Sequence, residues 1–271
     1  MFAATLIVFR ESLEAALVIG IVAAATRPIA GRGWWIALGA AAGVAGAVGV
    51  AAVARSISQW AGGSGQELFT AVVLALAVAM LAWHNVWMAS HGRQIAAQAR
   101  DLGKSVARGE VALTAIVTAI ALTVLREGSE TVLFLVGIAS SANSSRAALA
   151  IGSVLGLVAG GAAGTLMYVG LLRVPVNRLF VVTGWLILLL AAGMAGQFAR
   201  VLIQADVLPA LASPLWDTSS WMPDDSVLGT LLRALLGYQA QPSATQVLFY
   251  VAALVLIFAA MRRAQSRRPA A

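Results

Sequence analysis

Apolar residues fill long stretches of this chain, and short polar segments separate them. Each stretch is long enough to cross about 30 Å of hydrocarbon as a helix. Seven such spans are expected, at about 2–26, 34–55, 66–90, 111–138, 146–172, 178–204 and 246–262. The pattern therefore predicts an all-α, polytopic membrane protein with about seven transmembrane helices.

Lys and Arg are unevenly distributed over the polar segments, and this predicts the orientation of the chain. The connections after the first, third and fifth spans, with the C-terminal tail, hold twelve of the 18 basic residues. The opposite side holds four, and the remaining two, Arg10 and Arg126, lie inside spans. We expect the N-terminus outside and the C-terminus in the cytoplasm. No basic segment precedes the first apolar stretch, so no cleavable signal peptide is expected.

Two segments of the chain resemble each other. Residues 5–17 read TLIVFRESLEAAL and residues 121–133 read ALTVLREGSETVL, with six of thirteen positions identical. Three spans separate the copies, so the two halves would be inverted relative to each other, as in many secondary transporters. We expect a single permease domain over 1–271, divided as follows: repeat one at about 1–90, a cytoplasmic loop at 91–110, repeat two at about 111–204, an external loop at 205–245, a last helix at 246–262 and a basic tail at 263–271.

Composition removes several other classes of protein. Of the 271 residues, 61% are apolar and 11% are charged, against about 25% charged residues in soluble domains. The absence of cysteine excludes disulfides, thiolate metal sites and iron–sulfur clusters. The net charge is +7, but the basic residues lie in short loops and a tail, so a nucleic-acid partner is not expected.

Both repeats carry the motif Arg-Glu-x-x-Glu in the middle of a predicted span, formed by Arg10, Glu11 and Glu14 and by Arg126, Glu127 and Glu130. Helical spacing places the three groups of a motif on one face. Six charges at mid-membrane cost on the order of 15 kcal/mol before pairing, which favours a functional role over helix-stabilising ion pairs. Fully ionised, the six groups sum to −2, which suits a divalent cation. Carboxylate ligands suit iron, manganese, magnesium or calcium, and their softness does not separate iron from manganese.

Weaker candidates lie outside the motifs. His84 in the third span and His91 just after it are the two histidines of the chain, and they lie two helical turns apart. Each is either a polar group bonded to a neighbouring helix or an accessory metal or proton site. Asp217, Asp224 and Asp225 are either solvated loop charges or groups that attract cations or a partner. Asp225 or Ser226 is expected to cap an interfacial or re-entrant helix rich in leucine. Glycine stripes in the second and fifth spans predict close helix packing.

The doubled motif, the seven-span layout and the segments Asp225-Ser226-x-Leu228-Gly229 and Gly237-Tyr238 resemble the oxidase-dependent iron transporters. These are the high-affinity iron permeases of yeast and their bacterial ferrous-iron-uptake relatives. The resemblance implies iron (Fe²⁺ or Fe³⁺) as transported substrate, with no permanently bound cofactor. It also implies that the four motif glutamates bind iron, with the motif arginines in support. In the first motif, Ser12 occupies the position where the family often has glycine. In the second motif, Gly128 occupies that position. An external or periplasmic oxidase or iron-delivery protein is the implied partner, besides the lipid bilayer, and a bacterial inner membrane the implied location.

Other functions stay open at this stage. One is a permease or proton-coupled exchanger for another divalent cation such as manganese. More distant ones are an intramembrane hydrolase, for which the sequence has no His-Glu-x-x-His motif, and a metal sensor that binds without transport. The sequence favours a transporter over an enzyme.

Overall fold

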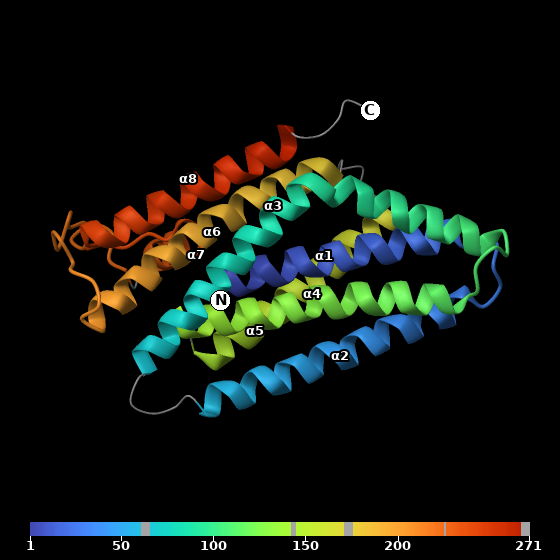
Figure 1. Ribbon diagram of the computed structural model, residues 1–271, viewed down its shortest axis with the longest axis horizontal. Helices are drawn as coiled ribbons and strands as arrows, with labels where there is room; N and C mark the ends of the chain where they lie inside the picture. Colours follow the sequence, from blue (N-terminus) through green and yellow to red (C-terminus); the bar gives the residue numbers. More distant parts are fainter. Residues whose placement is uncertain (61–65, 142–144, 171–175, 225, 267–271) are drawn as a thin grey trace.

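The computed structural model describes residues 1–60, 66–141, 145–170, 176–224 and 226–266. These residues form helices and no strand, in an elongated bundle (Figure 1). The helices are α1 (Phe2–Ala25), α2 (Arg32–Trp60), α3 (Gln66–Ala107), α4 (Thr114–Ser141), α5 (Arg146–Tyr168), α6 (Val176–Gln204), α7 (Val227–Leu236) and α8 (Ala244–Ser266). The prediction of an all-helical fold is confirmed.

Five of the described helices are long and apolar enough to cross a membrane, which identifies a multi-pass membrane protein. Their spanning segments are Arg32–Ser56, Glu67–Met88, Arg146–Tyr168, Val181–Gln204 and Ala244–Ser266. Helices α1 and α4 are also long, but each holds the three charged residues of a motif. The total of seven spans therefore stays a prediction.

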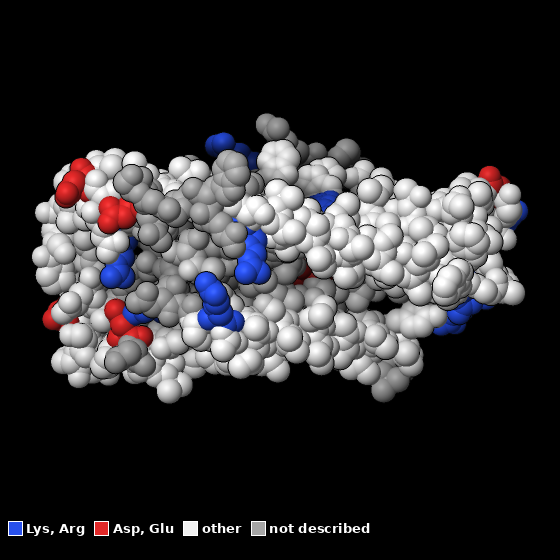
Figure 2. Space-filling view, turned by 90° about the horizontal axis from the view of Figure 1, so that it is seen from below, with Lys and Arg blue, Asp and Glu red and all other residues white. Residues whose placement is uncertain are grey.

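The surface of the bundle exposes more large apolar side chains than the surface of a water-soluble protein does. Val48 on α2, Val158 on α5 and Leu256 on α8 are 62%, 64% and 69% exposed, and many other large apolar side chains share this exposure. Figure 2 shows Asp and Glu mostly toward the two ends of the molecule and Lys and Arg also along its middle, with broad areas of uncharged surface around them. Such a surface is stable in contact with lipid chains.

Helix α3 is longer than the sequence predicts. The expected cytoplasmic loop at 91–110 is helical as far as Ala107, so α3 has 42 residues. Its last turns pack against the end of α1, where a Cβ on Gly103 would lie 2.4 Å from Cβ of Ala25. This segment packs against α1 and α4 through a narrow apolar stripe of Ala99, Leu102 and Val106, and the polar residues on its other faces do not read as a membrane span.

The helices pair reciprocally. Helix α1 packs against α5, α2 packs against α4, and α3 packs against α6. The first helix of each predicted repeat thus lies on the second helix of the other one. The repeat itself remains a prediction.

Glycines allow the closest of these contacts. A Cβ on Gly156 of α5 would lie 2.6 Å from the carbonyl oxygen of Thr5, and one on Gly160 would lie 2.5 Å from that of Phe9. On α2, a Cβ on Gly43 would lie 2.6 Å from Cβ of Val124. The packing role predicted for the glycine stripes is confirmed.

The connection between α6 and α8 is ordered by backbone and side-chain hydrogen bonds. Ser226 caps α7 by accepting a hydrogen bond from the amide of Gly229, as predicted, and Asp225 lies outside the described residues. Gly237 ends α7 in the left-handed conformation (φ 71°), which glycine adopts without strain.

Candidate functional site

The first motif lies on α1 with its charged groups buried. Arg10 Nε lies 3.0 Å from Glu14 Oε1, four residues further along the helix, and Arg10 Nη1 lies 3.5 Å from Glu11 Oε1. The three side chains are only 2%, 1% and 5% exposed. The α-helical spacing that the sequence predicts therefore brings the three groups together, and tertiary packing removes them from solvent.

The second motif repeats this arrangement on α4. Arg126 Nε donates a hydrogen bond to Glu130 Oε1 at 3.0 Å and lies 3.8 Å from Glu127 Oε1. The side chains of Arg126 and Glu130 are 38% and 17% exposed, so this motif borders the more open side of the site. The Arg126 guanidinium lies 4.1 Å from the centre of the Trp87 ring, in cation–π geometry.

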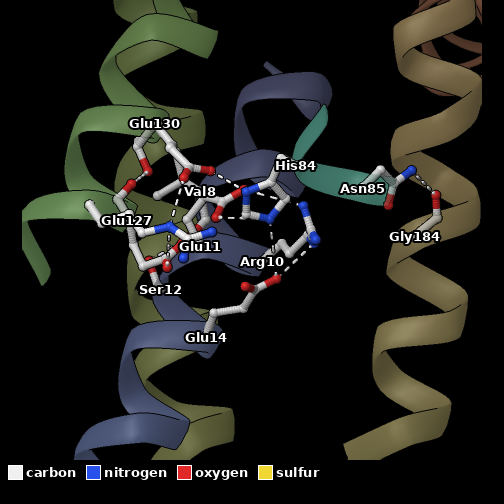
Figure 3. A network of polar contacts seen from close by, with 12 residues as sticks. Val8, Arg10, Glu11, Ser12, Glu14, His84, Asn85, Glu127, Glu130 and Gly184 are labelled. Carbon is white, nitrogen blue, oxygen red and sulfur yellow. Dashed lines mark hydrogen bonds and ion pairs between the residues drawn. The ribbon is translucent and has the colours of Figure 1, made fainter. Parts of the chain in front are cut away.

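His84 of α3 lies between the two motifs. Figure 3 shows its imidazole among the carboxylates of α1 and α4. Its Nε2 lies 3.9 Å from Glu11 Oε2 and 3.7 Å from Glu14 Oε1, and its Nδ1 contacts Glu130 Oε2. The ring also meets Phe134 edge-on, at 6.4 Å between centres. Of the weaker candidates, His84 is the one that the structure brings to the glutamates.

Asn85 holds this part of α3 in place, and sequence reasoning missed it. Its side-chain amide donates a hydrogen bond of 2.9 Å to the carbonyl oxygen of Gly184 on α6 (Figure 3). The side chain is 3% exposed. A buried amide beside an intramembrane histidine was the available signal, since such a group needs a partner on another helix.

The carboxylates of both motifs converge in one place. Two groups of side chains have ligand atoms within 4.8 Å of one another: Glu11, Glu14 and His84, and Glu11, Glu127 and Glu130. Glu11 belongs to both groups. In the described part of the chain, these are the groups of acidic and histidine residues close enough to share a metal ion.

Buried polar atoms without a hydrogen bond of acceptable geometry also concentrate in this cluster. Eight buried side-chain atoms in the described residues lack a hydrogen bond of acceptable geometry, and seven of them belong to Arg10, Glu11, Glu14, His84, Glu127 and Glu130. Among the seven, Arg10 Nε faces Glu14 Oε1 as an ion pair at 3.0 Å and His84 Nδ1 contacts Glu130 Oε2, so these four atoms are partly compensated. A bound cation can be coordinated by carboxylate oxygens and an imidazole nitrogen that are directed at one another in this way.

The other candidates that the structure describes, His91, Asp217 and Asp224, lie apart from the cluster. His91 stacks on Trp87 at 5.0 Å, and its Nδ1 lies 2.8 Å from the Ser90 hydroxyl. Asp224 accepts a hydrogen bond from the amide of Ala240 and pairs with Arg233 at 2.9 Å.

Asp217 is likewise occupied within the connection between α6 and α8. It accepts hydrogen bonds from the hydroxyl and amide of Ser219 and from the side chain of Gln241. These hydrogen bonds, that of the Ser219 hydroxyl first, hold the pKa of Asp217 below its ordinary value. The carboxylates of Asp217 and Asp224 therefore order the connection.

Comparisons with known proteins give matches over nearly the whole chain. The model of the iron permease FTR1 family matches residues 1–263. The chain is 32% identical over 256 residues to the ferrous iron permease EfeU of Escherichia coli O6:H1, covering 91% of this chain and 90% of that one. It is 30% identical over 268 residues to the EfeU of Yersinia pestis, covering 95% and 93%. No solved structure matches the chain.

The matches extend over both motif helices and the last helix, so they describe the whole bundle and not one segment. They also decide between the classes that the sequence left open, because the family is one of transporters and not of enzymes. The chain belongs to the iron permease FTR1 family, whose transported substrate is iron.

Proposed function

We propose that the protein takes up iron at high affinity into the cytoplasm, through a mid-membrane site built from Glu11, Glu14, Glu127 and Glu130. The observation that carries this proposal is the convergence of the two motifs. Glutamates more than a hundred residues apart in sequence place ligand atoms within 4.8 Å of each other. Ionised carboxylates at this separation repel one another, and a cation bound between them would remove this repulsion.

The two arginines of the site neutralise only half of the charge of its four glutamates. Arg10 and Arg126 each lie 3.0 Å from the second glutamate of their own motif. Glu11 and Glu127 also lie 3.5 Å and 3.8 Å from these arginines, but each motif has two carboxylates and one guanidinium, so the net charge is −2 when all six groups ionise. A divalent ion would neutralise this charge in surroundings of low dielectric constant, where the interaction is strong.

The surrounding architecture suits a transport site. Helices α1 and α4 have 24 and 28 residues, or lengths of about 36 and 42 Å, enough to cross the bilayer beside the five apolar helices. The reciprocal packing of α1 on α5 and of α4 on α2 is what an inverted repeat of three helices plus three would produce. We infer seven spans, with the N-terminus outside and the C-terminus in the cytoplasm.

The two ligand groups suggest the path of the ion. The group on the α4 side includes Glu130, which is 17% exposed, whereas Glu11 and Glu14 are 1% and 5% exposed. An ion that enters beside Glu130 would pass to the buried group through Glu11, which both groups share. Each step would replace some ligands while others stay bound.

The EfeU relatives are named ferrous iron permeases. For this chain we propose the bacterial cytoplasmic membrane as the location. We further propose that an external oxidase or iron-delivery protein hands over the ion, with the connection between α6 and α8 as the external surface that such a partner would meet.

The experiment is uptake of labelled iron by proteoliposomes that hold only this protein. Iron is offered either as Fe²⁺ under reductant or as chelated Fe³⁺. Uptake that disappears in Glu14→Gln and Glu130→Gln, at equal abundance in the membrane, is the expected result. Wild-type flux in both variants would remove the glutamates from the mechanism.

A second substrate is tested in the same assay. The donor set of the two groups is carboxylate oxygen with one imidazole, which suits manganese as well as iron. Uptake of labelled manganese that excess iron does not suppress would replace iron by manganese in the proposal.

A further inference from the structure

The surroundings of His84 are unusual for a buried histidine. Its side chain is 2% exposed, and neither ring nitrogen has a hydrogen bond of acceptable geometry. A buried imidazole that serves packing commonly donates one N–H to a backbone carbonyl. Here carboxylates of three glutamates on two other helices lie within 4 Å of the ring nitrogens. The ring is thus directed at the same space as the glutamate ligands.

The distances from His84 to the glutamates of α1 are those expected of ligand atoms that share one metal ion. Nε2 of His84 lies 3.9 Å from Glu11 Oε2 and 3.7 Å from Glu14 Oε1, beyond hydrogen-bonding distance. Ligand atoms about 2.1 Å from one ion lie about 3.0 Å apart when adjacent and about 4.2 Å apart when opposite. Both observed separations fall between these limits.

We propose that His84 is a direct nitrogen ligand of the transported ion, and that it makes the site select transition-metal cations over Mg²⁺ and Ca²⁺. This inference rests on the proposed function of the glutamate cluster. Oxygen ligands alone suit Mg²⁺ and Ca²⁺ well, and both ions are common. Imidazole binds iron and its neighbours in the first transition series and has little affinity for Mg²⁺ or Ca²⁺.

The hydrogen bond of the neighbouring residue supports this role. Asn85 ties α3 to the carbonyl oxygen of Gly184 and so fixes the turn of helix from which His84 projects. Metal sites hold a ligand in place through such supporting contacts. The competing interpretation is that His84 only positions Glu130, which its Nδ1 contacts. Direct ligation and positioning differ in whether nitrogen binds the metal.

Pulsed electron paramagnetic resonance of bound Mn²⁺ makes this distinction. The full chain is placed in lipid nanodiscs and loaded with Mn²⁺ alone, and ¹⁵N-histidine labelling of the wild-type chain reports on imidazole without any substitution. Because the chain has two histidines, His91→Gln is a matched control on the same helix. His91 stacks on Trp87, outside both ligand groups.

We expect nitrogen coupling to Mn²⁺ that changes with the ¹⁵N label and persists in His91→Gln. In His84→Gln the coupling should be lost and Mn²⁺ affinity should fall at least tenfold, since even supporting residues of metal sites contribute 10–100-fold. In proteoliposomes, iron uptake by His84→Gln should be inhibited at Mg²⁺ or Ca²⁺ concentrations at least tenfold lower than those needed for the wild type.

The outcomes separate this inference from the function on which it rests. If the wild type takes up iron without nitrogen coupling to Mn²⁺, His84 is not a ligand and the glutamate site stands. The same conclusion follows if the coupling vanishes in His91→Gln. If the wild type neither takes up iron nor binds Mn²⁺, the proposed function fails and the role of His84 fails with it.

Discussion

The packing of α1 on α5 leads to a sharp prediction about Gly156. An added methyl group in Gly156→Ala would lie 2.6 Å from the carbonyl oxygen of Thr5 and 2.8 Å from the amide nitrogen of Phe9. Both are backbone atoms, which cannot rotate away. Ordinary contact begins at 3.4 Å, so the two helices would have to separate by about 0.8 Å.

Two effects determine how strongly Gly156→Ala impairs stability and iron uptake. Overpacking of this kind lowers the free energy of unfolding by about 1–3 kcal/mol. The same movement carries Arg10, Glu11 and Glu14 with α1, whereas binding sites tolerate displacements of about 0.5 Å. Gly156→Ala should therefore reduce iron uptake more than its loss of stability alone would.

Gly161→Ala is the matched control, since a methyl group there meets nothing within 4 Å. It removes a glycine from the same helix, and the gain in helix propensity is about 1 kcal/mol in both variants. The assays are unfolding in mixed micelles titrated with dodecyl sulfate and iron uptake in proteoliposomes. Equal unfolding midpoints for the two variants, with wild-type uptake in both, would refute the reasoning.

Three further predictions concern charge, capping and orientation. Arg10→Met should lower the free energy of unfolding by about 3–5 kcal/mol, because Arg10 is 2% exposed and its loss leaves buried carboxylates unpaired. Arg126→Met should lower it less, because Arg126 is 38% exposed. Equal unfolding midpoints for the two variants would contradict this prediction. Ser226→Ala removes the hydrogen bond that caps α7 and should cost about 0.5–2 kcal/mol, measured as faster hydrogen exchange in α7, with unchanged exchange as the contrary result. An impermeant thiol reagent should label Ser220→Cys in intact cells but Glu110→Cys only after permeabilisation, since the chain has no other cysteine; the reverse pattern would invert the proposed orientation.

Several features of the protein followed from the sequence because they depend on neighbours along the chain. Seven apolar stretches coincide with helices, and the charged groups of each motif meet across one helical turn. Ser226 caps α7 because capping is decided within three residues. Glycine spacing indicated the close helix contacts, since small residues one turn apart form a flat strip on one face.

Tertiary structure alone decided which faces meet. His84 is 73 residues from Glu11 and 46 from Glu130, and no local pattern relates positions so far apart. Its place between the motifs depends on the packing of α3 against α1 and α4, and on the Asn85 contact with α6. The burial of Arg10 and the exposure of Arg126 have the same origin, because their motifs are alike in sequence. Periodicity assigns each side chain to a face of its helix, whereas the neighbour of that face is fixed only when all the helices pack together.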